Sequence, residues 1–175
     1  MRIGVISDTH GNLAAWEAAW PHLADAELLV HCGDVLYHGP KFKPSPAYDP
    51  AALAAAINAA PMPVLIARGN ADSNADQLVL NVPVQAPYVF AQVEGRRLLV
   101  AHGEGPTADE LLTLAAKWKV ELLFTGHLHV PTIRRVEGIL HVNPGSPTYP
   151  LGEVRAPTCA VVVDGEAELI TMNYE

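Results

Sequence analysis

The stretch that decides the fold of this chain is RIGVISDTHGN, residues 2–12. An apolar run that ends at a small polar residue predicts a buried central strand over residues 2–7. Such a strand presents the residues that follow it at its carboxyl end, where open α/β sheets carry their ligands. Asp8 and His10 are two residues apart, so in an extended segment both side chains point the same way and can hold one metal ion. A single Asp-x-His is more often a turn residue near a surface histidine, so the assignment depends on whether the arrangement recurs.

It recurs at four further predicted strands, each of which ends in a polar residue beside glycine. These ends are Gly33-Asp34 after residues 27–31, Gly69-Asn70 after 64–67, His102-Gly103 after 96–101, and Gly126-His127-Leu128-His129 after 121–125. The glycine at each of these strand ends allows the backbone to turn sharply and to approach an ion. A turn aspartate or a core histidine explains any one of these ends, but that explanation would have to hold independently at all five.

The donor set indicates the kind of metal. The seven candidate ligands are Asp8, His10, Asp34, Asn70, His102, His127 and His129. A mixture of carboxylate, imidazole and amide donors without cysteine suits divalent transition metals, and we expect manganese first, with iron, nickel, cobalt or zinc as alternatives. Seven donors exceed the three or four that one open catalytic site requires, so the count predicts two divalent metal ions that share one carboxylate. As a neutral ligand, Asn70 keeps the site more positive than a carboxylate would, which favours an anionic substrate.

The order of predicted elements indicates the fold class. Helices are predicted over residues 12–20, 51–60 and 107–118, and Pro21 is expected to limit or kink the first of them. The proline-rich stretch 36–50 predicts a long surface loop. A hairpin is predicted over residues 88–101, and the tail predicts short strands over 132–136, 139–142, 158–163 and 166–171. Strand-helix units followed by hairpins predict an α/β fold in which two sheets pack as a sandwich with helices outside.

Length, composition and charge narrow the class of protein. With 175 residues, half of them hydrophobic, the chain fits one domain over residues 1–175. The net charge of −8 argues against a broad nucleic-acid-binding face. Because there is no signal-peptide pattern and no apolar run approaching 18 residues, we expect a cytoplasmic protein that does not enter a membrane. Cys32 and Cys159 are expected to be small buried residues rather than a disulfide. The proline-rich and aromatic loop segments are compatible with a homo-oligomer.

Several further residues are candidates for the site or its surroundings. Asn12 and Arg68 lie beside ligands in the sequence, where they would contact phosphate oxygens or instead cap a helix and form a salt bridge. Two other histidines are not expected at the site: His22 is expected in a solvated loop and His31 in the core. His38 and His141 are nearer the candidate site, where they could support the ligands.

The five polar strand ends resemble, in the same order, the five motifs of the calcineurin-like metallophosphoesterases. They are Asp8-x-His10, Gly33-Asp34, Gly69-Asn70-x-Asp72, His102-Gly103 and Gly126-His127-x-His129. The resemblance covers nearly the whole chain. Further segments resemble the small bacterial phosphodiesterases of the YfcE type, namely Val35-Leu36 with His38-Gly39-Pro40, Ala71-Asp72-Ser73 with Asp76-Gln77, and Asn143-Pro144-Gly145-Ser146.

This resemblance implies a four-layer α/β/β/α sandwich and a role for each ligand. Asp8, His10 and His129 would bind one metal, Asn70, His102 and His127 would bind the other, and Asp34 would bridge them, with Asp34 and Asn70 assigned as catalytic residues. The implied activity is a metal-dependent phosphodiesterase acting on small phosphate esters. Two cations lower the pKa of a shared water, so that hydroxide can attack phosphorus in line near neutral pH.

Two departures from the wider superfamily affect the expected substrate. Ala71 occupies the position where phosphoprotein phosphatases and related nucleases carry a histidine that can protonate the leaving group, so esters with good leaving groups should react best. Glu104 occupies a position where a second histidine is common. Two alternatives stay open: a phosphomonoesterase or nucleotide hydrolase with the same site, and a non-catalytic scaffold similar to the retromer subunit of this fold. The complete ligand set favours an enzyme.

Overall fold

The computed structural model describes residues 1–153 and 155–174, and β1 (Arg2–Ile6) lies at the centre of its first sheet. This sheet has the order β11-β10-β1-β2-β3-β4. The strands β2 (Leu28–His31), β3 (Val64–Ala67) and β4 (Val84–Gln85) run parallel to β1, and β10 (Thr158–Val163) and β11 (Glu166–Thr171) complete the other side in antiparallel register. Ile3 is paired with Leu28 on one side and with Val162 on the other.

The second sheet has the order β5-β6-β7-β9-β8. Its three inner strands, β6 (Arg96–Val100), β7 (Leu122–Phe124) and β9 (Ile139–Asn143), are parallel, and the edge strands β5 (Val89–Val93) and β8 (Thr132–Val136) are antiparallel to their neighbours. The hairpins β5-β6, β8-β9 and β10-β11 turn at the pairs Glu94-Gly95, Glu137-Gly138 and Asp164-Gly165, all with positive φ. Positive φ at both central residues matches the right-handed twist of the paired strands.

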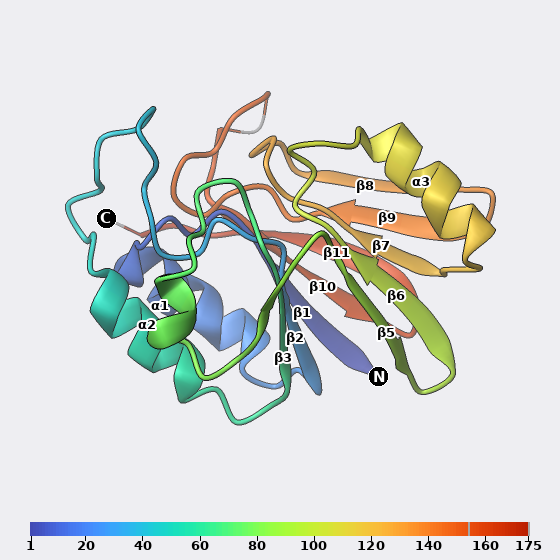
Figure 1. Ribbon diagram of the computed structural model, residues 1–175, viewed down its shortest axis with the longest axis horizontal. Coiled ribbons are helices and arrows are strands. Elements are labelled where there is room, and N and C mark those ends of the chain that lie inside the picture. The colour runs from blue at the N-terminus through green and yellow to red at the C-terminus, as the bar shows by residue number, and fades with distance from the viewer. Residues whose placement is uncertain (154, 175) are drawn as a thin grey trace.

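Helices cover the two outer faces of the sandwich (Figure 1). The helices α1 (Leu13–Leu23) and α2 (Pro50–Asn58) lie on the first sheet, and α3 (Ala108–Lys117) lies on the second. Three hydrophobic clusters fill the spaces between the four layers. The alternation along β1 explains this, because Ile3 and Val5 point into the cluster between the sheets whereas Ile6 points toward the helices. The predicted α/β/β/α sandwich is therefore confirmed.

The elements differ from the sequence-based expectation at three places. α1 continues past Pro21 to Leu23, because a proline in the last turn removes only one backbone hydrogen bond and Ala24 N–H still donates to Trp20 at 2.9 Å. The 3-10 turn η1 (Asp76–Leu78) and the two-residue β4 were not predicted. Such short elements carry too few residues to show a period. Residues 36–49 form the expected long loop, without helix or extended strand.

The cysteines and the apolar segments also follow the sequence-based expectation. Cys32 and Cys159 are buried free thiols, as predicted. Among the described residues, no helix is long and apolar enough to cross a bilayer.

Candidate metal centre

Five of the seven candidate ligands converge in the interior, at the carboxyl ends of β1, β2, β6 and β7. They form two groups whose ligand atoms lie within 4.8 Å of one another, Asp8 with His10 and His129, and Asp8 with Asp34 and His102. Nε2 of His129 lies 3.1 Å from Oδ1 of Asp8 and 3.3 Å from Nε2 of His10. Nε2 of His102 lies 3.3 Å from Oδ2 of Asp34. The first group contains the same residues as the first predicted metal set.

The other two candidate ligands lie at the rim of this cluster. Asn70 and His127 line a cavity of about 120 Å³ together with His10, Asp34 and His129. The imidazole rings of His127 and His102 are 5.2 Å apart between centroids. Asn70 is exposed. The structure thus places Asp34 next to His102, with Asn70 and His127 on the solvent side of the same cavity.

Three histidines are oriented by hydrogen bonds from the far side of the ring. Nδ1 of His10 donates to the carbonyl of Tyr37, Nδ1 of His102 to that of Cys32, and Nδ1 of His129 to that of Tyr149, each at 2.8 Å. Because a carbonyl can only accept, the proton of each neutral ring is on Nδ1. Nε2 is then a free lone pair that points into the cluster, which is the arrangement of a metal-binding histidine.

Two buried polar atoms in the cluster have no hydrogen-bond partner. Within residues 1–153 and 155–174, these are Oδ1 of Asp8 and Nε2 of His102, each in a residue that is at most 1% exposed. The other oxygen of Asp8 accepts from the Ser7 hydroxyl and from His127 N–H. An unsatisfied buried donor or acceptor costs about 1–3 kcal/mol, and a cation bound between these atoms would remove that cost. The donor set therefore fits divalent metal ions.

The ionisation of these side chains shows that the cluster favours positive charge. Burial opposes ionisation of Asp8, but the imidazoles of His129 and His102 beside its carboxylate lower its pKa to about 2. Burial likewise opposes protonation of His102, but the carboxylates of Asp34 and Asp8, 3.3 Å and 3.9 Å from Nε2, raise its pKa to about 9. Without metal, a proton on His102 compensates the two carboxylates. A divalent cation would supply the same compensation and would displace that proton.

The backbone around the cluster is held in a strained conformation. In the described part of the chain, nine non-glycine residues have positive φ. Four of them lie in hairpin turns or just after α3, where such angles are common. The other five are candidate ligands, namely Asp8, His10, Asp34, His127 and His129, with φ between 48° and 65°. Left-handed φ at non-glycine residues costs on the order of 1 kcal/mol or more each and is concentrated at functional sites.

Two glycines allow the ligand loops to approach one another closely. A Cβ atom at Gly69 would collide with the carboxylate of Asp34, and a Cβ atom at Gly126 would collide with the hydroxyl of Ser7. The amide of Ala71 donates to Oδ1 of Asp34 at 2.7 Å, so the β3 loop orients the Asp34 side chain. These glycines matter here because any side chain would push the loops apart.

Sequence reasoning assigned no role to three residues that hold the ligand loops. Asp72 accepts hydrogen bonds from the backbone N–H groups of Asp34, Val35 and Gly69 at 2.7–2.9 Å. Ser146 donates to the carbonyl of Asp8, and Asn143 donates to that of Gly126, both at 2.8 Å. Asp72 and the segment 143–146 are part of the motif pattern in the sequence, which was the available signal. The accepting carbonyls give no such signal because every residue has one.

The two tentative substrate-binding residues have different surroundings. Asn12 is buried, its side chain caps α1 by accepting from Ala15 N–H, and its amide donates to the hydroxyl of Tyr174. It therefore occupies the capping role that was its alternative. Arg68 is exposed and donates to the backbone carbonyl of Asp72 at 3.3 Å, with the rest of its guanidinium free to reach a second hollow beside Asn70.

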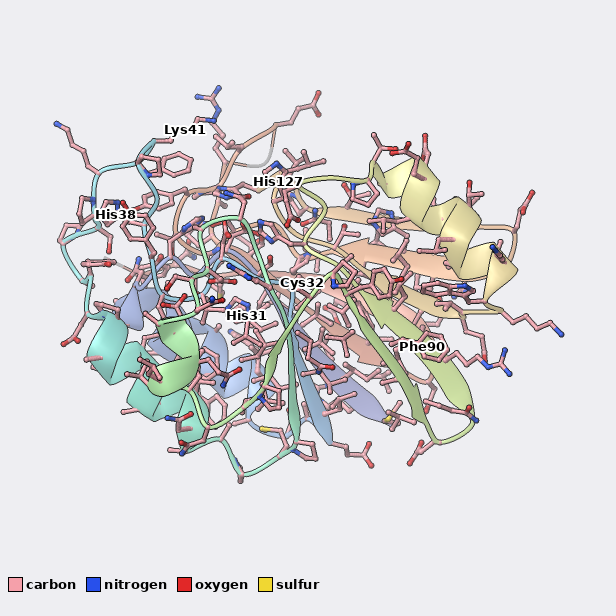
Figure 2. All side chains as sticks on the ribbon, viewed as in Figure 1. His31, Cys32, His38, Lys41, Phe90 and His127 are labelled. Atoms are coloured by element: carbon pink, nitrogen blue, oxygen red, sulfur yellow. The ribbon has the colours of Figure 1, made fainter. Side chains whose placement is uncertain are left out.

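The other histidines mostly follow expectation. His22 is exposed but lies in the last turn of α1 rather than in the predicted loop, because the helix continues past Pro21. His31 is buried, where it bonds to Thr9 and to Gly33 N–H. His141 bonds to Thr125 at 2.9 Å, just before the ligand loop of β7. His38 lines the metal cavity together with Lys41 of the same loop and with His127, and all three are labelled in Figure 2.

Comparisons with known proteins agree with this geometry. The family model of the calcineurin-like phosphoesterase superfamily domain matches residues 1–167. The phosphodiesterase YfcE of Escherichia coli K12 is 37% identical over 156 residues, which cover 87% of this chain and 82% of that protein. The solved structure of YfcE, a phosphoesterase from E. coli, has a TM-score of 0.78 at 28% identity and covers 99% of this chain and 100% of that one.

A more distant relative shows the fold alone. Vacuolar protein sorting 29 of Cryptosporidium parvum has a TM-score of 0.67 at 17% identity over 98% of this chain and 96% of that one. The family match over most of the chain, together with the clustered donors, supports a metal-dependent phosphoesterase. The chain belongs to the calcineurin-like phosphoesterase superfamily.

Proposed function

We propose that this chain is a phosphodiesterase that hydrolyses small phosphate esters with two divalent metal ions, manganese first among them. Asp8, His10 and His129 would hold one ion, Asn70, His102 and His127 would hold the other, and Asp34 would bridge them. The observation that carries the proposal is the pair of buried, unpartnered atoms, Oδ1 of Asp8 and Nε2 of His102, at the centre of the cluster. The relative YfcE, named a phosphodiesterase, supports the reaction class.

The ions, when bound, would lower the pKa of a water and neutralise charge on the phosphoryl oxygens. The residues of the chain supply position and charge. The carbonyls of Tyr37, Cys32 and Tyr149 keep Nε2 of the three buried histidines directed into the cluster. Asn70 adds a neutral oxygen donor at the open side. Arg68 lines the hollow that adjoins Asn70, from which its guanidinium would assist an anionic ester. Ala71, next to Asn70, offers no proton to the leaving group, so we expect aryl esters to react fastest.

The shape around the site favours a diester over a monoester. Two hollows flank the metal cavity, one of about 420 Å³ that includes Ala71 and one of about 480 Å³ that includes Asn70. Because Asn70 and Ala71 also line the metal cavity, both hollows adjoin it. A phosphodiester has two organic substituents and needs room for both, whereas a monoester needs room for one.

Hydrolysis of bis-p-nitrophenyl phosphate tests the proposal. Metal-stripped protein should be inactive, added Mn²⁺ should restore activity, and Asp34→Ala and His127→Ala should abolish it under the same conditions. Arg155→Ala, at an exposed residue outside the cluster, is the control and should retain activity. Absence of hydrolysis with Mn, Ni, Co and Zn, in protein that binds metal, would contradict the proposal and favour a scaffold of the same fold. Faster hydrolysis of p-nitrophenyl phosphate than of the diester would favour a phosphomonoesterase.

A further inference from the structure

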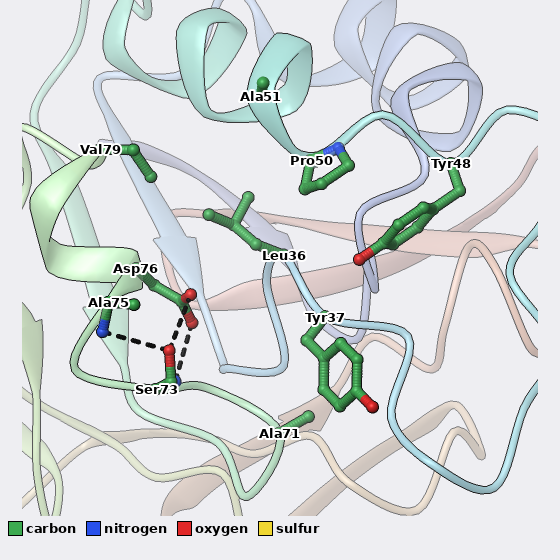
Figure 3. Close-up of a pocket in the computed structure, with 10 residues that line it drawn as sticks. All are labelled: Leu36, Tyr37, Tyr48, Pro50, Ala51, Ala71, Ser73, Ala75, Asp76 and Val79. Atoms are coloured by element: carbon green, nitrogen blue, oxygen red, sulfur yellow. Dashed lines mark hydrogen bonds between the residues drawn. The ribbon is translucent and has the colours of Figure 1, made fainter.

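An apolar groove of about 420 Å³ opens beside the metal cavity (Figure 3). Its walls come from the loop after β2, the first turn of α2 and the segment around η1. They include the side chains of Leu36, Tyr37, Tyr48, Pro50, Ala71 and Val79. A volume in the range of about 300–1,000 Å³ is typical of sites for small molecules.

The groove adjoins the metal cavity on one side. Ala71 lines both, and it follows Asn70 in the chain. The ring of Tyr37 lies 4.6 Å from that of His38, and Tyr48 meets His38 edge-on at 5.2 Å, while His38 itself lines the metal cavity. The carbonyl of Tyr37 accepts from His10 at 2.8 Å. The groove and the metal cavity therefore meet at Ala71, and a substituent of a ligand held at the metal centre would enter the groove past that residue.

The lining of the groove indicates what it would accept. No lysine or arginine is among its described lining residues, and its carboxylate, Asp76, already accepts from the backbone N–H and the hydroxyl of Ser73. Apart from Ser73, the rest of the lining is aliphatic side chains, the Pro50 ring and two phenol rings. Such a surface favours apolar and aromatic groups and offers few partners to a sugar or a second phosphate. The hollow on the other side differs, because Arg68 and Glu104 line it.

We propose that this groove binds an apolar, aromatic substituent of the phosphate ester whose phosphoryl group is held at the metal centre. The inference rests on the proposed function and names the class of substrate: an ester in which at least one substituent is aromatic or comparably apolar. Tyr37 and Tyr48 would contact the ring, and Leu36, Val79 and Pro50 would bury its edge.

Phosphonates test the groove separately from catalysis, because they present phosphoryl oxygens and are not hydrolysed. Binding of methylphosphonate and phenylphosphonate to the Mn-loaded protein is measured by calorimetry. Burial of most of a phenyl ring predicts about tenfold tighter binding of phenylphosphonate than of methylphosphonate. Ala51→Trp, at an exposed residue on one wall, should reduce that ratio to about twofold or less by filling the groove, while the methylphosphonate affinity stays unchanged.

Two further variants make the result specific. Ala75→Trp fills the groove from the η1 side and should act as Ala51→Trp does, and Ala116→Trp, at an exposed alanine of α3 on the other sheet, should keep the wild-type ratio. Methylphosphonate that binds with phenylphosphonate no tighter, or a ratio unaffected by both groove variants, would overturn the inference while leaving the proposed function intact. No binding of either phosphonate to Mn-loaded protein would overturn the proposed function and this inference together.

Discussion

Asp72 is a residue on which the metal centre depends although it is not among the proposed ligands. Its carboxylate joins the β2 loop to the β3 loop through three backbone N–H groups, and it lies in the same loop as Asn70. Burial raises the pKa of Asp72 to about 6, against the hydrogen bonds from those amides, which favour the anion. The relative placement of Asp34 and Asn70 therefore depends on one buried charge.

We predict that Asp72→Asn weakens metal binding more than it weakens the fold. The amide places an N–H₂ group against backbone donors, which should lower the free energy of unfolding by about 1–3 kcal/mol. Mn²⁺ affinity should fall about 10- to 100-fold, as is usual when support for a ligand is lost. Calorimetric Mn²⁺ titration and urea unfolding measure the two effects. The control is Asp76→Asn at the start of η1, where the carboxylate accepts hydrogen bonds from Ser73. An equal loss of metal affinity in this variant would refute the role given to Asp72.

At this scale the sequence allowed the donor types and their order to be predicted, but not their support. Asp34, Asn70 and His102 stand beside glycine at strand ends, and that pattern is local. The Nδ1–H bonds of His10 and His129 go to the carbonyls of Tyr37 and Tyr149, which are 27 and 20 residues away. Nothing in a side-chain pattern marks a particular carbonyl as an acceptor, so the orientation of the rings could not be predicted.

Among the elements, α1 is capped by Asn12, a residue for which the sequence left two roles open. Asn12 accepts from Ala15 N–H at 3.1 Å and is 3% exposed. We predict that Asn12→Asp retains the cap and loses only the 3.3 Å donor bond to Tyr174. The KM for bis-p-nitrophenyl phosphate should therefore stay near wild type, and the unfolding free energy should fall by less than in Asn12→Ala. Asn12→Ala should lose about 1 kcal/mol of unfolding free energy. Urea unfolding and steady-state kinetics measure these effects. A large rise in KM for Asn12→Asp at unchanged stability would instead favour contact with the phosphate.

β7, β8 and β9 are connected by a buried histidine. Nδ1 of His141 accepts from Arg134, and Arg134 also pairs with Asp109 of α3 at 2.8 Å. Nε2–H then donates to Thr125. Burial, with the charge of Arg134, lowers the pKa of His141 to about 4. The folded state thus keeps this ring neutral, and a second proton would point at the guanidinium.

This histidine should make the protein acid-sensitive. Because the unfolded chain binds the proton with a pKa near 6.5, the unfolding free energy falls as the pH decreases from about 6.5 toward 4. The contribution of His141 at pH 5 is a loss of about 2 kcal/mol. His141→Gln can keep both hydrogen bonds without titrating. Its stability loss between pH 7.5 and 5, measured by urea unfolding of metal-free protein, should be smaller by that amount, whereas exposed His22→Gln should match the wild type. Equal losses in all three proteins would contradict the assignment.

In the whole molecule, the site depends on strand pairings between distant segments. β1 is paired with β10 across about 160 residues, and Ser146 and Thr148 bond to the carbonyls of Asp8 and Thr9. The sequence predicted most strands and the three helices because their apolar periods are local. Strand order could not be read from those periods, since β1 has suitable partners in several apolar strands. The convergence of the five strand ends was inferred from their polar residues.

The proposed site holds two metal ions, and the number of metal ions bound per chain measures this arrangement. Metal-stripped protein is equilibrated with excess Mn²⁺, desalted and analysed for manganese per chain, beside His10→Ala and His102→Ala variants checked for folding by circular dichroism. We predict two manganese ions per wild-type chain and one in each variant, because His10 and His102 belong to different ligand groups. One ion or none in the wild type, or loss of both ions in a folded single variant, would contradict two separate sites bridged by Asp34.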